Sequence, residues 1–315
     1  IVHTWYGKTV IYSDRRFTYE DVQTIIETKE GDHKEEILWL HDYTQNLRKK
    51  RFENGAINFS SQEVRFTLDA TGKPIGITVK ESKASHQLIE ELMLKANQLI
   101  AEKMGKIKIK SEVLPFPYRV HDQPNEEKLA PFVSFALSHG YPFDLSTPEK
   151  IAQSFNNLML SAHGKPEQHV LEQLGIRTMA KAVYTTNNIG HYGLGFEYYC
   201  HFTSPIRRYP DVMTHRLLQH YLEGGKSPKA EAYEEKCKHS SEQEYLASKA
   251  ERDSIKYMQI RFMQDHKNKE FIGVISGVTD WGIYVEIISN KCEGMVKISE
   301  IKGDYYVYDE KRHRL

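Results

Sequence analysis

The residues best suited to chemistry lie in one short stretch, residues 201–211, which reads HFTSPIRRYPD. Thr203 or Ser204 can cap a helix, because a side-chain hydroxyl accepts backbone N–H groups that a helix start leaves free. Pro205 would follow in the first turn, where its fixed φ is favourable. The pattern therefore predicts a helix that begins near Ser204 and continues past Pro210.

Two arginines, Arg207 and Arg208, would lie in the opening turns of this helix. Free N–H groups and the positive end of the helix dipole favour an anion there. An arginine side chain can bind a phosphate through two parallel hydrogen bonds. The residue types thus indicate a phosphate site, but an ordinary capped helix with two solvated arginines fits them equally well.

Other reactive groups give weaker indications. Cys200 and His201 are neighbours in the chain, so their side chains point apart and do not favour a nucleophile–base pair. The set Cys237-Lys238-His239 is too sparse for a zinc site. The glycines at 190, 193 and 195 lack the Lys-Ser/Thr of a phosphate loop, and we interpret them as a tight turn.

The order of residues in 201–211 closely resembles the signature of the ribonuclease II/ribonuclease R (RNB) family, together with the preceding HYGLGFE at 191–197. A match of this length with two prolines is highly specific. Further stretches resemble other blocks of the family in the right order, so the resemblance covers essentially the whole chain. These stretches are 16–22, 55–59, 63–66, 88–97 and 249–253.

The resemblance implies processive hydrolysis of single-stranded RNA from its 3′ end, with release of nucleoside 5′-monophosphates. Carried over by position, Arg207 would hold the phosphate near the scissile bond, Glu90 would line the pocket of the last nucleotides and Glu251 would lie at the 3′ terminus. Phe59 would stack on a terminal base, an interaction worth about 1–3 kcal/mol for any base. Tyr19 would line the same pocket as Glu90, and the remaining RNA-binding residues implied for the catalytic domain are Arg208, His191 and Tyr192.

Each of these residues also has an ordinary structural explanation. Tyr19 fits a surface position in the first turn of a helix, and a lone phenylalanine such as Phe59 is usually part of a core. Glu90 and Glu251 fit solvated helix carboxylates. Without the resemblance, these explanations would be the commoner ones.

The metal site that the resemblance implies has no counterpart in the chain. The family binds Mg²⁺ through four clustered aspartates, in chemistry resembling two-metal phosphoryl transfer. The aspartates here are scattered and no D-x-D-D run occurs. Because Tyr19 matches a segment downstream of the cluster, we expect the aspartates to lie upstream of Ile1. The sequence therefore predicts no metal ligand in this chain, Mg²⁺ only in the intact enzyme, and little or no activity for this chain alone.

The last part of the chain, 269–315, resembles the start of an OB-fold RNA-binding domain of the ribosomal-protein S-one type. Trp281 and Tyr284 would stack on bases from its barrel face, although either could be barrel core. Within the family, these strands favour the ribonuclease R branch. We therefore expect an α+β fold, with the C-terminal part of an RNB catalytic domain over 1–268 followed by a truncated all-β OB barrel over 269–315.

The elements that must position these residues are mainly helices. Apolar spacing and capping residues predict helices near 18–26, 35–53, 85–103, 125–139, 148–163, 166–184 and 229–266. Period-two alternation predicts strands at 8–13, a hairpin over 63–79, and strands near 271–275, 282–287 and 294–299.

Composition restricts the class of protein without identifying it. Hydrophobic residues make up 39% and charged residues 27%, with 43 basic and 43 acidic side chains, so net charge indicates no partner. No apolar run approaches the roughly 20 residues that span a bilayer, and the start resembles no signal peptide. Three scattered cysteines favour a reducing, cytoplasmic setting. We expect single-stranded RNA as the partner, with other RNA-decay or ribosome-associated factors as further candidates, and neither a membrane nor a small-molecule cofactor.

Two alternatives to an exoribonuclease stay open at this point. One is a non-catalytic RNA-binding protein that uses the same channel. The other is an inactive scaffold member of the same family, whose upstream sequence would carry substituted aspartates.

Overall fold

The computed structural model describes residues 3–59, 63–80, 82–109, 112–165, 167–301 and 306. The chain divides into two compact units, each assembled from three separate stretches. The first unit takes residues 1–54, 82–121 and 182–241, and the second takes 55–81, 122–181 and 242–315. We describe each unit by itself.

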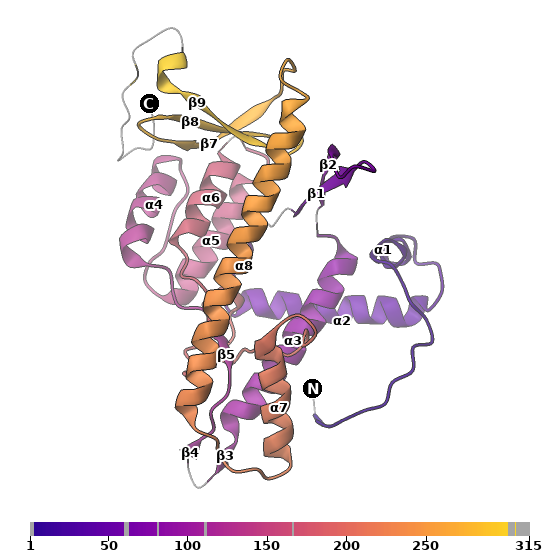
Figure 1. Ribbon diagram of the computed structural model, residues 1–315. Helices are drawn as coiled ribbons and strands as arrows, with labels where there is room; N and C mark the ends of the chain where they lie inside the picture. The colour runs from indigo at the N-terminus through magenta and orange to yellow at the C-terminus, as the bar shows by residue number, and fades with distance from the viewer. Residues whose placement is uncertain are drawn as a thin grey trace. The chain divides into compact units, whose positions relative to one another are not determined.

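Helices dominate the first unit (Figure 1). Helix α1 begins with a capping box, in which the Thr18 hydroxyl accepts the Asp21 N–H and the Asp21 carboxylate accepts the Thr18 N–H. The first unit also contains two short antiparallel pairs, β3 with β4 and β5 with β6. Its elements are α1 (Tyr19–Thr28), α2 (Lys34–Glu53), α3 (Ala84–Lys106), β3 (Lys108–Ile109), β4 (Glu112–Val113), β5 (Tyr118–Val120), β6 (Val183–Thr185), η1 (Tyr192–Leu194), α7 (Tyr209–Leu222) and the first turns of α8 (Ala230–Gln264).

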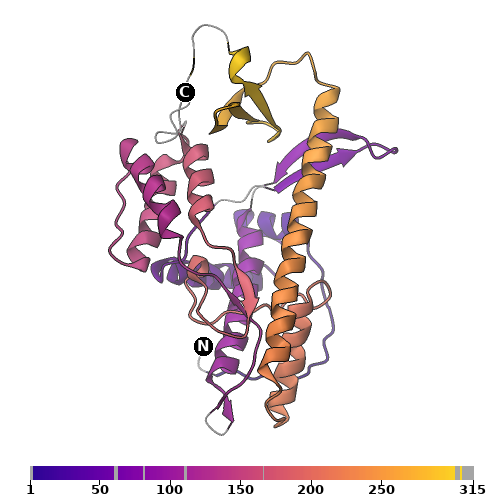
Figure 2. The same ribbon diagram turned by 60° about the vertical axis from the view of Figure 1, so that its left-hand side comes forward.

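The core of the first unit lies between the C-terminal half of α3, the strand β5 and helix α7. Phe116 is fully buried beside Met104 of α3 and Leu217 of α7. Figures 1 and 2 both show α7 running alongside the first turns of α8, where Met213 and Cys237 share a smaller buried cluster with Tyr184. This core fixes the segment before α7, in which the sequence places its arginines.

The second unit combines a hairpin, a group of three helices, the later turns of α8 and a small sheet. The hairpin β1–β2 is antiparallel, and α4, α5 and α6 pack around Phe132 and Phe155. Thr147 caps α5 and Pro148 occupies its first turn. The sheet has the antiparallel order β7-β8-β9. The bounds are β1 (Glu63–Leu68), β2 (Pro74–Lys80), α4 (Glu126–Ser138), α5 (Pro148–Ala162), α6 (Gln168–Thr178), β7 (Gly273–Val278), β8 (Gly282–Ile287), β9 (Glu293–Lys297) and η2 (Ile298–Glu300).

The expected α+β fold is confirmed, with helices followed by a small antiparallel sheet that is not closed into a barrel within the described residues. The predicted helices α1 to α5 and α8 are present within a few residues of their expected bounds. The boundary predicted at residue 268 stays a prediction, since the second unit contains residues on both sides of it. In the part of the chain that the structure describes, no helix is long and apolar enough to cross a membrane.

Three expected elements differ from those observed. Residues 8–13 form no strand, because an alternating segment is a strand only when a neighbour pairs with it, and no ladder within the described residues includes them. Helix α6 ends at Thr178, well before 184, and Tyr184 lies in strand β6. Pro166, the expected start of that helix, lies outside the described residues.

The third difference concerns the helix that carries the arginines. It begins at Tyr209 and not near Ser204. Pro210 explains the shift, because a proline in a helix interior lacks an N–H and its ring clashes with the carbonyl four residues earlier. With the helix starting at Tyr209, Pro210 falls in the first turn, where it is tolerated.

Candidate functional site

The two arginines of the 201–211 stretch lie in a turn that precedes α7. The Ser204 carbonyl accepts the N–H groups of Arg207 and Arg208 at 3.3 and 3.1 Å, which closes the turn. The Arg207 side chain is exposed and has no ion-pair partner among the residues that the structure describes. The turn therefore presents one guanidinium to solvent, where it can meet an anion.

Arg208 has a different environment from Arg207. Its Nε and Nη2 atoms donate to the two carboxylate oxygens of Asp211, each at 2.8 Å, and the Asp211 side chain is fully buried. A two-point pair of this kind satisfies both charges within the protein. The predicted contact of Arg208 with RNA stays a prediction, but this geometry gives its guanidinium a structural partner.

The segment before the turn is anchored to α3 by Asn97, which is 3% exposed. The Asn97 side chain accepts the Phe202 N–H at 3.0 Å and donates to the Tyr199 hydroxyl at 3.1 Å. The Cys200 thiol donates to the Asn97 main-chain carbonyl at 3.3 Å. One buried asparagine thus fixes three positions of the segment that leads to Arg207.

Helix α3 also brings Tyr19 close to the position of Glu90. The Tyr19 ring stacks on His86, with ring centroids 4.3 Å apart and an interplanar angle of 11°. His86 and Glu90 are four residues apart on α3 and so lie on the same face of the helix. Tyr19 is 41% exposed and Glu90 is also exposed, so both can reach a ligand. The structure therefore places Tyr19 about one helical turn from Glu90.

His191 and Tyr192 belong to a compact aromatic group in the first unit. The His191 ring stacks on His121 at 5.1 Å and meets the Tyr199 ring edge-on at 5.3 Å. The Tyr192 N–H donates to the His121 carbonyl at 2.8 Å. The predicted glycine turn is present here, since Gly190 and Gly195 adopt φ values of 80° and 66°. A positive φ is favourable for glycine, which has no Cβ.

Two histidines of this region, His191 and His201, are held neutral. Burial, followed by the nearby His121 and Arg119, lowers the pKa of His191 to about 3. Burial, followed by Arg208 and Arg119, lowers the pKa of His201 to about 2. The His201 ring also forms a 2.7 Å hydrogen bond between its Nδ1 and the Tyr184 hydroxyl. Neutral His191 and His201 rings suit packing and hydrogen bonding and carry no positive charge near pH 7.

Four predicted residues lie in the second unit, two of them outside its sheet. Phe59 is half-buried and meets the fully buried Phe155 ring edge-on at 5.8 Å. Glu251 is exposed on α8 and has no ion-pair partner within the described ranges. The base-stacking role of Phe59 stays a prediction, as does the role of Glu251 at an RNA end.

The other two predicted residues of the second unit are on the sheet. Trp281 is 75% exposed in the turn that leads into β8, whereas Tyr284 is partly buried within that strand. Side chains alternate along a strand, so Tyr284 and Glu286 point to one face and Val285 and Ile287 to the other. Glu286 lies 3.6 Å from the His169 ring of α6.

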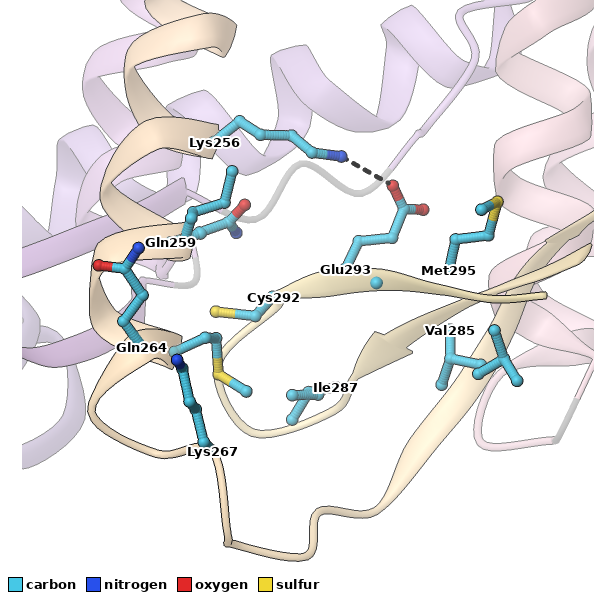
Figure 3. A pocket seen from close by; sticks show the side chains of 13 residues that line it. Lys256, Gln259, Gln264, Lys267, Val285, Ile287, Cys292, Glu293 and Met295 are labelled. Carbon is cyan, nitrogen blue, oxygen red and sulfur yellow. Dashed lines mark ion pairs between the residues drawn. The ribbon is translucent and has the colours of Figure 1, made fainter. Parts of the chain in front are cut away.

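The face that carries Val285 and Ile287 lines a pocket that the sequence did not reveal (Figure 3). Its volume is about 480 Å³, and the last turns of α8 form its opposite side. An ion pair between Lys256 and Glu293, at 3.6 Å, spans its edge. The lining is mainly apolar, and it includes neither Trp281 nor Tyr284.

No group of three or more His, Cys, Asp or Glu side chains within the described residues is placed to hold a metal ion. A divalent cation with oxygen ligands generally needs several carboxylates. The described residues therefore do not provide the group of carboxylates that the implied Mg²⁺ site needs.

Sequence reasoning missed the roles of Asn97 and Asp211. Asp211 follows Arg208 by three residues at a helix start, a spacing that favours an ion pair. Asn97 interrupts the apolar stripe of α3, and a buried amide there needs partners. Neither signal identifies the partner segment, because the contacts of Asn97 join residues about a hundred positions apart.

Comparisons with known proteins point in one direction. The chain matches the family model of the RNB domain over residues 1–224 and that of the S1 RNA binding domain over residues 264–314. Ribonuclease R of Aquifex aeolicus is 37% identical over 318 residues, which cover 98% of this chain and 44% of that protein. The chain thus spans less than half the length of this curated relative.

Solved structures show the same fold. Mycoplasma genitalium RNase R in complex with ribose-methylated single-stranded RNA matches 95% of this chain and 48% of its own, with a TM-score of 0.83 and 25% identity. Yeast Ssd1, a pseudonuclease, matches 94% of this chain and 37% of its own, with a TM-score of 0.69 and 20% identity. The second likeness concerns the fold alone.

Proposed function

We propose, because this chain belongs to the RNB domain family, that it is part of an exoribonuclease that hydrolyses single-stranded RNA processively from the 3′ end to nucleoside 5′-monophosphates. The observation that carries the proposal is the exposed Arg207 guanidinium in its fixed turn, within a chain that matches the RNB model over residues 1–224. An exposed guanidinium on a fixed backbone turn, without a protein counter-charge, suits a phosphodiester.

In this proposal, Arg207 has one role, and Tyr19 and Glu90 together have another. Arg207 binds the phosphate near the scissile bond, and its charge offsets the negative charge that develops there during hydrolysis. Tyr19 and Glu90 line the pocket of the last nucleotides. Their proximity across α1 and α3, through the His86 stack, supports a joint role.

The predicted residues of the second unit would also contact RNA. Phe59 stacks on a terminal base, Glu251 lies at the 3′ end, and Trp281 and Tyr284 contact bases further along the strand. His191 and Tyr192, from the first unit, lie along the RNA channel. We infer that the exposure of Trp281 and Glu251 makes them available to a ligand.

The metal is proposed from the resemblance and not from the residues of this chain. Mg²⁺ would activate water and stabilise the leaving oxygen. Its aspartate ligands would lie in a segment that this chain does not contain, so we expect the chain alone to degrade no RNA. We also propose a cytoplasmic location and RNA-decay or ribosome-associated factors as further partners.

A digestion of 5′-labelled single-stranded RNA with Mg²⁺ tests this function. The chain alone is compared with the full-length protein that contains the upstream segment. We expect a ladder that ends in very short products from the full-length protein only. Degradation by the chain alone would mean that its metal site lies among residues to which we assign a purely structural role.

Two variants of the full-length protein sharpen this experiment. Arg207→Ala should reduce turnover far more than RNA affinity, because one phosphate contact among many changes binding little. Arg216→Ala removes another exposed arginine, from α7, and should leave turnover near that of the unchanged protein. No degradation by the unchanged full-length protein, with RNA still bound, would favour a non-catalytic RNA-binding or scaffold role.

A further inference from the structure

One buried carboxylate, that of Asp211, holds the two ends of the turn that carries Arg207. Asp211 is fully buried in the first turn of α7. Its Oδ1 atom accepts the Ser204 N–H at 2.7 Å and the Arg208 Nη2 at 2.8 Å, while its Oδ2 accepts the Arg208 Nε at 2.8 Å. This carboxylate therefore binds the first and the last residue of the turn at the same time.

The two arginines of the turn consequently have separate environments. The Arg208 charge is compensated by Asp211 within the protein. Arg207 lies between the two anchored residues, is exposed, and has no counter-charge in the part of the chain that the structure describes. A backbone fixed on both sides limits the positions that the Arg207 guanidinium can reach.

A second set of contacts holds the entry to the turn. His215, one helical turn beyond Asp211 on α7, forms a 2.9 Å hydrogen bond between its Nε2 and the Phe202 carbonyl. The rings of Phe202 and His215 also stack, with centroids 4.0 Å apart. Asn97 accepts the Phe202 N–H from the side of α3. The turn is thus tied to α7 at 202, 204 and 208.

We propose that Asp211 is a positioning residue for the reaction, which sets the place of the Arg207 guanidinium by holding Ser204 and Arg208 together. The inference rests on the proposed role of Arg207 and goes beyond it. Asp211 itself touches no RNA, since its side chain is fully buried. Its contribution is geometric, and a displacement of about 1 Å at a reacting group can reduce a rate about 100-fold.

The test is a double-mutant cycle in the full-length protein with Mg²⁺ and single-stranded RNA, using Asp211→Asn, Arg207→Ala and both together. Asparagine keeps the size of the side chain and one acceptor for Ser204, but it loses the charged two-point contact with Arg208. We expect Asp211→Asn to lower kcat by about 10- to 100-fold. RNA affinity should change by less than about threefold, because phosphate contacts elsewhere dominate binding.

The double variant separates a positioning role from general damage. If Asp211 acts through Arg207, adding Asp211→Asn to Arg207→Ala should lower kcat by less than about twofold more, since interacting residues are not additive. Additive losses in the cycle would overturn the proposal, as would an unchanged kcat for Asp211→Asn. An unchanged kcat for Arg207→Ala alone would instead overturn the proposed role of Arg207.

A neutral pair guards against misfolding. Asp211→Asn leaves the Arg208 guanidinium partly buried without its counter-charge, which can destabilise the turn. Arg208→Gln combined with Asp211→Asn removes both charges, and with them the charged two-point contact that holds Ser204 and Arg208 together, but it leaves no unpaired charge. This variant should melt near the unchanged protein and still show the loss of kcat. Full kcat in a folded neutral pair would contradict the proposal.

Discussion

The Arg51 guanidinium and the Glu91 carboxylate meet inside the first unit, with Arg51 Nη2 2.5 Å from Glu91 Oε1. Arg51 is 6% exposed and Glu91 is 2% exposed. A second arginine, Arg48, lies 3.4 Å from the same oxygen. The contact joins α2 to α3, directly beside the exposed Glu90 that is proposed to face RNA.

We predict that Glu91→Gln lowers the free energy of unfolding by about 3–5 kcal/mol, because it leaves buried arginine charge without its partner. Urea unfolding followed by circular dichroism measures this change. Glu102→Gln, which removes a surface partner of Lys106 on the same helix, is the matched control and should cost less than about 1 kcal/mol. Equal losses from the two variants would show that burial adds nothing to the Glu91 contact.

The two partly buried histidines, His191 and His201, predict a fall in stability toward acid. In the folded protein the pKa of His191 is about 3 and that of His201 about 2, whereas the ordinary value is 6.5. Below pH 6.5 the unfolded chain therefore binds protons that the folded protein does not. The stability from this difference is complete above pH 6.5 and is lost progressively as the pH falls toward 3 and 2.

Unfolding free energies measured at pH 7.5 and at pH 5.5 test this prediction. Each histidine should contribute at most about 1.4 kcal/mol per unit of pH below 6.5. The His201→Gln variant should show a shallower decline. His163→Gln is the control, since it removes an exposed histidine and leaves His191 and His201 intact. If the free energy of unfolding of His201→Gln fell just as steeply with pH, groups other than His201 would be responsible for the fall.

Two glycines of the sheet should respond in opposite ways to alanine. A Cβ on Gly282 would lie 2.2 Å from the Val296 carbonyl oxygen and 3.1 Å from the Lys297 Cα, and backbone of a paired strand cannot move aside. A Cβ on Gly294, in β9, would meet nothing within 4 Å. We predict that Gly282→Ala destabilises the sheet by about 1–3 kcal/mol. Gly294→Ala should be neutral or stabilise it by up to about 1 kcal/mol.

Amide hydrogen exchange along β8 and β9 is the suitable measurement for these variants, because it reports local opening that a global melt can miss. Faster exchange in Gly282→Ala than in Gly294→Ala is the expected order. Faster exchange in Gly294→Ala than in Gly282→Ala would mean that β8 and β9 can move apart at Gly282 without loss of stability.

Trp281 should contribute to RNA binding by the chain itself. Trp281→Ala is expected to weaken binding of a labelled single-stranded oligonucleotide by about 1–3 kcal/mol, the range for stacking one base on an aromatic ring. Fluorescence anisotropy gives the two affinities. Trp39→Ala, which removes a similarly exposed tryptophan from α2, should change the affinity little. Unchanged binding by Trp281→Ala would remove this residue from the proposed RNA surface.

Local signals in the sequence predicted local structure well. The Thr18 cap of α1 and the Thr147-Pro148 start of α5 were predicted because their contacts span only a few residues. The start of α7 was predicted wrongly, because Ser204 offers a good cap but Pro210 excludes a helix that began there. A cap is one interaction, whereas a proline inside a helix costs about 3 kcal/mol or more.

Contacts between distant segments were beyond sequence reasoning. The pairing of β5 with β6, in which Tyr118 lies opposite Thr185, involves two strands of three residues that carry no periodic pattern. The residue types of the candidate site were found through the family resemblance. The sequence did not show that Arg207 is exposed while Arg208 is ion-paired, because this difference depends on the buried position of Asp211.

The interleaving of the two units has a consequence for synthesis on the ribosome. The chain passes between the units at 54/55, 81/82, 121/122, 181/182 and 241/242. The first unit lacks its last segment until residue 241 has been translated, by which time two of the three segments of the second unit have already emerged. Domains usually fold one after another as they leave the ribosome. Here the N-terminal segments of each unit leave the ribosome before the later segments that complete that unit.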